Sequence, residues 1–138
     1  MPTQASSAYG TKLAMGSGAG TLIAELTNLT DVGGTFATVD VSAHDGTSGW
    51  GSKIPTLLDG GVVRATFNFV PGNAQHIALR TNMLNRTSTP FTVTWPTTGT
   101  PTVTFNAFVT RYRIPGAPVN GALVLEVELT VDGVVTFT

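Results

Sequence analysis

The chain has 138 residues, a formal net charge of −1 and no cysteine, and only 11% of its residues are Asp, Glu, Lys or Arg. The absence of cysteine excludes disulfides, thiol catalysis and Cys-ligated zinc, while the absence of a Lys/Arg cluster argues against a protein that grips DNA or a membrane surface. Frequent Thr, Val and Gly predict one mainly β domain over residues 1–138, and the low charge favours a surface that neighbouring subunits cover.

The first part of the chain predicts a mobile segment followed by strands. Residues 1–20 are small and polar, so we expect a mobile arm with one short strand near Lys12–Met15. A short strand over Thr21–Leu26 follows. In Phe36–Ser42, apolar and polar residues alternate with the period of a strand, which predicts a half-buried strand.

Residues 43–57 show no periodicity and contain three glycines, which predicts a long loop between strands. Such a stretch is uncommon inside a compact domain unless it has a function. Trp50 lies in the middle of this loop and carries a large apolar surface, so we expect it to occupy a pocket on its own domain or on a partner.

A strand and the single good helix candidate come next. Val62–Val70 alternates Ala, Phe and Phe against Arg, Thr and Asn, which predicts a strong strand. Asn73–Asn85 is predicted to be a helix because the Asn73 side chain can cap its first turn. Four apolar residues at helical spacing predict the face that packs on a sheet. They are Ala74, Ile77, Ala78 and Leu84.

The last part of the chain predicts further strands. Pro90–Trp95 alternates, and Thr102–Ile114 alternates with a change of phase, which indicates either a β-bulge near residues 107–109 or a strand that moves between sheets. Alternating Leu and Val from Leu123 to Val131 precede Asp132-Gly133, which predicts a type I′ hairpin. The sum is a β-sandwich of two packed antiparallel sheets with one flanking α-helix.

The chemistry-bearing residues are few. His44 and Asp45 form the one local pair that suggests a site, but with Asp40 they make a poor metal set, and a polar loop pair is the simpler interpretation. Glu126 and Glu128 point to one face of a strand, as expected for a solvated face rather than an acid–base pair across a cleft. His76 is expected to be a neutral surface or packing residue. We therefore predict no catalytic site, no metal and no cofactor.

One segment carries a resemblance. Residues 38–69 read TVDVSAHDGTSGWGSKIPTLLDGGVVRATFNF. A strand ending in an acidic residue leads into a His/Asp loop, which closes on an I-P-x-L-x-D-G-G-like turn before a strand with F-x-F alternation. This order resembles the core of the major tail protein (tail tube) family of long-tailed phages, and the following helix, long strand and closing hairpin also fit from about Gly20 onward.

The resemblance implies a structural virion protein and not an enzyme. Its subunits would form hexameric rings that stack into a hollow tube, through which DNA passes during ejection without specific binding. The implied partners are further copies of the chain and the tape-measure, tail initiator and tail terminator proteins. The implied location is the phage tail, assembled in the host cytoplasm, with no membrane contact.

Seven residues of the loop region are the expected assembly contacts, and two acids are the expected lumen-facing residues. The assembly residues are His44, Asp45, Trp50, Lys53, Ile54, Pro55 and Leu57, and the lumen residues are Glu126 and Glu128. Arginines lie on strands too, so the opposite assignment of the lumen face stays open. Two alternatives also remain: another virion β-sandwich protein (tail completion or decoration) and a carbohydrate-binding β-sandwich module.

Overall fold

The protein folds into two antiparallel sheets and one helix. The structure, a computed structural model, describes residues 7–18, 20–44, 49–97 and 99–138. A seven-stranded sheet has the order β2-β1-β7-β8-β9-β6-β3, and a two-stranded sheet pairs β4 with β5. The elements are β1 (Lys12–Met15), β2 (Thr21–Leu22), β3 (Leu26–Thr30), β4 (Thr35–Asp40), β5 (Lys53–Asp59), β6 (Val62–Asn68), α1 (Ala74–Asn85), β7 (Ser88–Thr94), β8 (Thr102–Arg113) and β9 (Val124–Phe137). The predicted mainly β class with one helix and two antiparallel sheets is confirmed.

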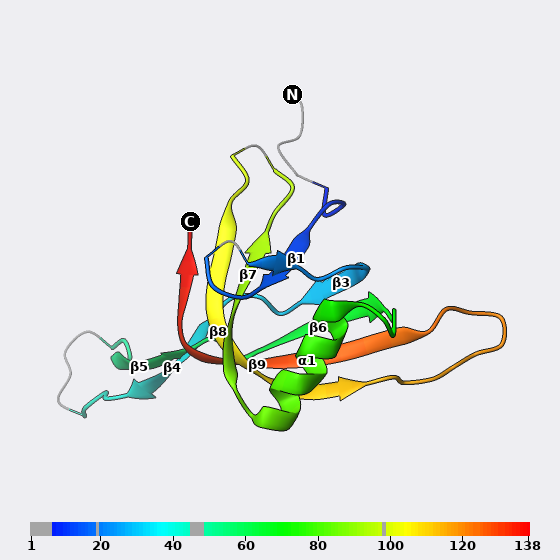
Figure 1. Cartoon of the computed structure of the whole chain (residues 1–138). Helices are drawn as coiled ribbons and strands as arrows, with labels where there is room; N and C mark the ends of the chain where they lie inside the picture. The colour runs from blue at the N-terminus through cyan, green and yellow to red at the C-terminus, as the bar shows by residue number, and fades with distance from the viewer. Residues whose placement is uncertain (1–6, 19, 45–48, 98) are drawn as a thin grey trace.

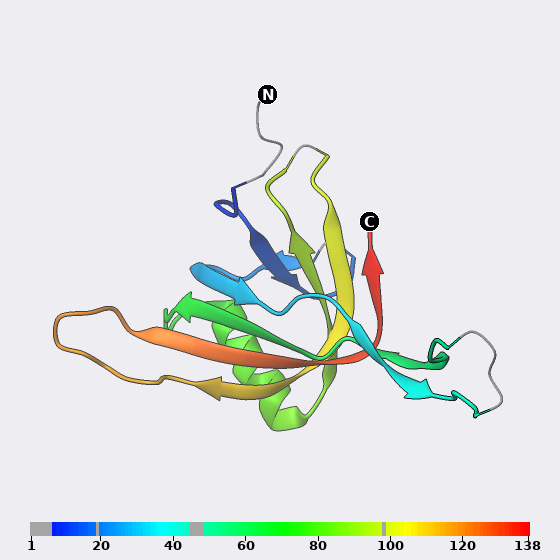
Figure 2. The same cartoon turned by 180° about the vertical axis from the view of Figure 1, so that it is seen from behind.

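The large sheet is strongly curved, and α1 lies against it (Figures 1 and 2). The small β4–β5 sheet extends away from the body on one side, and the loop between β8 and β9 extends on the other. All residues of β4 and β5 are exposed. The curved large sheet folds over its own core, and α1 covers the core from the same side. The small sheet does not pack on this core.

The core gathers the inward side chains of five strands and the helix, with Ile23 from the segment after β2. Alternation in β6, β8 and β9 sends every second side chain inward, as the period of a strand requires. The buried cluster comprises Leu13, Met15, Ile23, Val63, Ala65, Phe67, Leu79, Phe91, Val93, Val103, Phe105, Ala107, Val109, Leu125, Val127 and Leu129.

The predicted helix and its cap are confirmed, but its buried face is different from the predicted one. Asn73 Oδ1 accepts hydrogen bonds from the backbone N–H groups of Gln75 and His76. The helix buries His76 and Leu79, whereas Ile77 and Leu84 are exposed. The apolar residues of the helix did not predict its packed face, because that face includes a buried polar residue, His76.

His76 is a packing residue whose ring is fully hydrogen-bonded. The Val70 N–H lies 3.3 Å from Nδ1, and Nε2 lies 2.9 Å from the Ala24 carbonyl oxygen. Because Nδ1 accepts, Nε2 must carry the proton, which fixes a neutral tautomer. The ring also lies 5.5 Å from the Phe67 ring centroid. The histidine thus joins the loop before β3, the end of β6 and the helix.

Two predictions near the chain's first half need correction. The strand at Lys12–Met15 is confirmed as β1, but Leu13, Ala14 and Met15 are buried, so this part of residues 1–20 is not a mobile arm. The expected loop over residues 43–57 is also too long, because its last five residues belong to β5 and pair with β4. Asp45 lies outside the described residues.

The predicted hairpin at Asp132-Gly133 is wrong. Both residues lie inside β9, which continues to Phe137 and stays paired with β8. Asn106 pairs with Asp132 but Phe105 pairs with Val135, so β9 holds two extra residues at this point. Gly133 has φ 85, a left-handed conformation that glycine adopts without steric cost. The dipeptide therefore forms a bulge in a strand rather than a turn between strands.

Gly60 links the small sheet to the body at a very close approach. A Cβ added there would lie 2.3 Å from Val131 Cγ1 and 2.9 Å from Val135 Cγ2. We expect Gly60→Ala to lower the free energy of unfolding by about 1–3 kcal/mol through overpacking. Urea unfolding measures this. Gly72→Ala is the matched control, since a Cβ at Gly72 meets nothing within 4 Å. Equal stability of the two variants would contradict the prediction.

Candidate functional site: an apolar sheet and a charged face

The β4–β5 sheet, here called the apolar sheet, exposes large hydrophobic side chains. Leu57 and Leu58 expose 90% and 79% of their surface. The other exposed apolar side chains of this region are Phe36, Val39, Val41 and Ile54. Adjacent residues of a strand point to opposite faces, so Leu57 and Leu58 make both faces of the apolar sheet hydrophobic. The half-burial predicted for the strand at Phe36–Ser42 is wrong, because every residue of β4 is exposed.

The apolar sheet also has two open edges among the described residues. β4 pairs with β5, and neither strand has a second neighbour in the described part of the chain. Unpaired edges present backbone N–H and C=O groups that readily pair with another chain. A two-stranded sheet is at best marginally stable alone in water. The apolar sheet therefore has the character of an element completed by a partner.

Few charges lie on the apolar sheet. Asp40 is in register with Lys53 at the end near the loop. The Ser42 backbone N–H donates a 2.8 Å hydrogen bond to Asp40 Oδ1, and this bond, helped by the Ser42 side chain, holds the pKa of the Asp40 carboxyl below its usual value. Asp40 thus stays ionised in a conformation set by its own turn.

The residues expected to make assembly contacts lie on or beside this sheet. Lys53, Ile54, Pro55 and Leu57 are in β5, and all are exposed. Trp50, which is 85% exposed, and His44 lie in the connection between the two strands. Sequence reasoning missed Phe36 and Leu58. The signal for Leu58 was present, because two adjacent leucines in a strand cannot both face one core.

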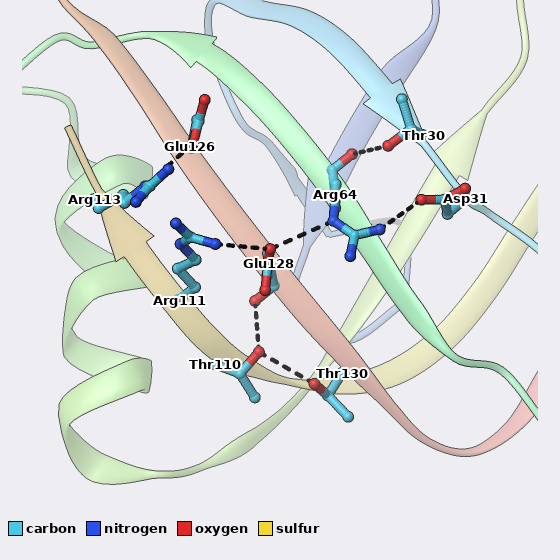
Figure 3. A network of polar contacts seen from close by, with 9 residues as sticks. All are labelled: Thr30, Asp31, Arg64, Thr110, Arg111, Arg113, Glu126, Glu128 and Thr130. Carbon is cyan, nitrogen blue, oxygen red and sulfur yellow. Dashed lines mark hydrogen bonds and ion pairs between the residues drawn. The ribbon is translucent and has the colours of Figure 1, made fainter. Parts of the chain in front are cut away.

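The second candidate surface, here called the charged face, is the outer side of β6, β8 and β9. It comprises Asp31, Arg64, Arg111, Arg113, Glu126 and Glu128 (Figure 3). Glu126 and Glu128 lie on β9, opposite the buried Leu125, Val127 and Leu129, as the alternation predicted. The arginines come from the strands on either side, so acidic and basic residues share one face.

Strand register places each acid beside an arginine. Glu128 is the cross-strand neighbour of Arg64 on β6 and of Arg111 on β8. Its Oε1 lies 3.4 Å from Arg64 Nε and 3.2 Å from Arg111 Nη1. Arg113 Nε lies 3.3 Å from Glu126 Oε2. Arg64 Nη1 also lies 2.7 Å from Asp31 Oδ2. Three arginines thus face three carboxylates.

A β-bulge in β8 makes this register possible. Val109 pairs with Leu129 and Arg111 pairs with Glu128, so Thr110 is the extra residue. The predicted bulge is confirmed, slightly beyond the expected positions. Thr110 Oγ1 donates to the Glu128 carbonyl oxygen and lies 3.1 Å from Thr130 Oγ1. Without the extra residue, the alternation of β8 would point Arg111 and Arg113 toward the core.

Tyr112 occupies the core side between the two arginines. It packs against the edge of the buried cluster. Burial raises the pKa of the Tyr112 hydroxyl, and the positive charge of Arg80 opposes this effect. The bulge thus sends one aromatic side chain inward and two charged side chains outward.

Other chemistry finds little support in the described residues. Within them, no group of three His, Asp or Glu side chains could hold a metal ion. His76 is committed to the core, and His44 is exposed in a loop. No helix in the described ranges is long and apolar enough to span a membrane.

Comparison with known proteins finds similarity in structure alone. No protein-family model and no curated protein matches the chain. A chain from the sheath/tube terminator of an extracellular contractile injection system (PVC) superposes with a TM-score of 0.77 at 15% identity, covering 99% of this chain and 98% of that one. A chain from the C6-symmetric tail of an empty gene transfer agent particle gives 0.73 at 23%, with 93% of both chains covered.

A third structure is the SPP1 tail tube. Its chain superposes with a TM-score of 0.66 at 14% identity, covering 92% of this chain and 75% of that one. The resemblance stated from the sequence is therefore confirmed at the level of the fold, over nearly the whole chain. At these identities the comparisons establish the fold alone. The function must be inferred from the two surfaces described above.

The ion pairs of the charged face should be measurable by a double-mutant cycle. We expect Arg111→Ala and Glu128→Gln to show a coupling of about 0.2–1 kcal/mol in urea unfolding, because the pair is partly exposed. The equivalent cycle on Arg113 and Glu126 is the comparison, and its coupling should be smaller since both side chains are more exposed. Zero coupling in the first cycle would show that Glu128 does not hold Arg111.

Proposed function

We propose that this protein is a structural subunit of a phage-type tail tube, which assembles into six-membered rings that stack into a hollow tube. The observation that carries the proposal is the exposed apolar sheet on a body whose fold is shared with tail components. A monomer that exposes both faces of a hydrophobic sheet invites association. A ring uses a heterologous interface that closes, and stacking uses one that does not.

The geometry supports the apolar sheet as an assembly element. The sheet reaches away from the body (Figure 1), so a neighbour can cover it without disturbing the core. Fully burying a leucine contributes about 1.5–3 kcal/mol, so Leu57 and Leu58 alone could supply several kcal/mol per contact. His44, Asp45, Trp50, Lys53, Ile54 and Pro55 would complete the contact, together with Phe36.

The remaining parts of the proposal follow from the tube. Further copies of the chain, a tape-measure protein, a tail initiator and a tail terminator would be its partners. DNA would pass through the tube without specific binding. The protein would act in the virion after assembly in the host cytoplasm, and it would have no enzymatic activity.

A tail terminator or another capping component is the second candidate. Its support is the fold shared with a chain of a sheath/tube terminator. The two functions differ in stacking, because a terminator forms a ring that ends the tube whereas a tube subunit forms a filament. Filament formation by the purified protein therefore separates them.

The first test replaces the two most exposed leucines of the apolar sheet. We expect the wild-type protein to form tubes of uniform width at rising concentration, seen by light scattering and negative-stain microscopy. Leu57→Asp with Leu58→Asp should abolish them, because buried carboxylates oppose the contact.

The matched control carries the same change at exposed apolar positions elsewhere. Leu84→Asp with Val119→Asp alters side chains that are also well exposed, one on the helix and one on the β8–β9 loop. Tubes should persist in this control. Tubes in the Leu57/Leu58 variant would remove the apolar sheet from the proposal, and isolated rings in the wild type would favour the terminator.

The second test asks whether the charged face lines the tube. The chain has no cysteine, so one introduced thiol reports one position. Thr66 is the cross-strand neighbour of Glu126, and Thr66→Cys places a thiol beside it. In assembled tubes we expect this thiol to react with a small maleimide but hardly with a large polyethylene-glycol maleimide.

Two other single cysteines calibrate the labelling. Leu57→Cys should react with neither reagent once the apolar sheet is covered, and Val119→Cys, in the exposed loop between β8 and β9, should react with both. Protection of the Thr66→Cys thiol from both reagents would place the charged face at a subunit contact, and the lumen assignment of Glu126 and Glu128 would be wrong.

A further inference from the structure

The charged face concentrates charge on a chain that has little of it. Six of the fifteen formally charged residues lie there, three arginines and three carboxylates. In the proposed tube, DNA is the polyanion that this face would meet. Arg64 on β6 and the two arginines on β8 flank β9, about 10 Å apart across the sheet, and would by themselves make a phosphate-binding patch.

We propose that the charged face is a DNA-facing surface kept electrically neutral by cross-strand pairing, so that it neither holds nor repels DNA. The inference rests on the proposed function for the identity of DNA as the passing partner. It departs from the acidic lumen that Glu126 and Glu128 alone would make, because both acids are paired with arginines.

The pairing geometry explains how the arginines are masked. A phosphate that approaches Arg111 or Arg64 must come close to Glu128, which contacts both guanidinium groups. Arg64 also carries Asp31 at 2.7 Å on Nη1. Like charges a few ångströms apart repel, and a phosphate that displaces the carboxylate leaves it unpaired. Replacing the carboxylate on an arginine by a phosphate therefore gains little binding free energy, because the exchange releases no net counterions.

The position of the acids makes this masking efficient. Glu128 lies on the central strand of the three, between Arg64 on β6 and Arg111 on β8, and its side chain is only 26% exposed. A carboxylate so placed keeps one geometry more readily than a fully solvated one. Glu126 holds Arg113 two residues further along the same strand.

The test removes the acids while keeping their shape. Glu126→Gln with Glu128→Gln raises the formal net charge by two and frees Arg111 and Arg113, while Arg64 keeps only Asp31. The control, Asp40→Asn with Asp59→Asn, makes the same change in net charge on the apolar sheet, away from this face. Fluorescence anisotropy with a short double-stranded DNA, on unassembled protein at several salt concentrations, measures binding.

We expect wild type and control to bind DNA weakly and alike. The Glu126/Glu128 variant should bind about tenfold more tightly at low salt, with a logarithmic salt slope of about 2 to 3, as expected for two or three phosphate contacts. Asp31→Asn is a second variant, which removes one of the two carboxylate partners of Arg64. Asparagine suits position 31 because its φ is 63.

Two results would overturn the inference. Wild-type protein that binds DNA with the salt slope of the Glu126/Glu128 variant would show that the pairs mask nothing. Variants that bind no better than the control would show that the arginines cannot reach phosphates. Both results come from unassembled protein, so they are independent of whether tubes form.

Discussion

The extra residue in β8 is the constraint on which both sides of the large sheet depend. Strand periodicity alone would place residues 103 to 113 of odd number on the core side, and this holds for Val103 through Val109. The Thr110 bulge reverses the phase, so Tyr112 turns inward and Arg111 and Arg113 turn outward. An arginine buried without a partner would cost far more than a bulge. The bulge thus preserves the core and creates the charged face in the same step.

Burial and exposure are distributed unusually in this chain. The large sheet closes its own core with the help of α1, and none of the residues described in β4 and β5 belongs to that core. The apolar sheet remains as hydrophobic surface attached through Gly60, where the backbone passes against Val131. The chain is thereby divided into a part that is buried within one copy and a part that the proposed association would bury. A subunit that must fold before it assembles needs such a division, because folding and association then bury different side chains.

Sequence reasoning succeeded where the signal was local and failed where a distant strand decided the outcome. The Asn73 cap, the alternation of β9 and the phase change in β8 are visible in short windows, and the structure contains all three. Asp132-Gly133 has the same local conformational preference in a turn and in a bulge. The continuing partner strand β8 selects the bulge, and that partner cannot be read from the dipeptide. The regular alternation of Phe36–Ser42 likewise predicted half-burial, although alternation says nothing about whether a covering layer exists.

The charged face shows the same limit and why it matters for function. The glutamates and their shared strand face could be read from the sequence, but their pairing depends on registers that join β9 to residues 64, 111 and 113. Read alone, Glu126 and Glu128 indicate an acidic surface. Read with their cross-strand neighbours, they form a neutral one.

A conduit for a polyanion can avoid adhesion by repulsion or by neutrality. Neutrality here requires no excess charge of either sign, which is consistent with a chain whose total formal charge is −1. Repulsion would instead place like charges close together around a ring, where each added subunit raises the electrostatic cost of assembly. In the proposed tube, compensation within each subunit would avoid that cost before a ring forms.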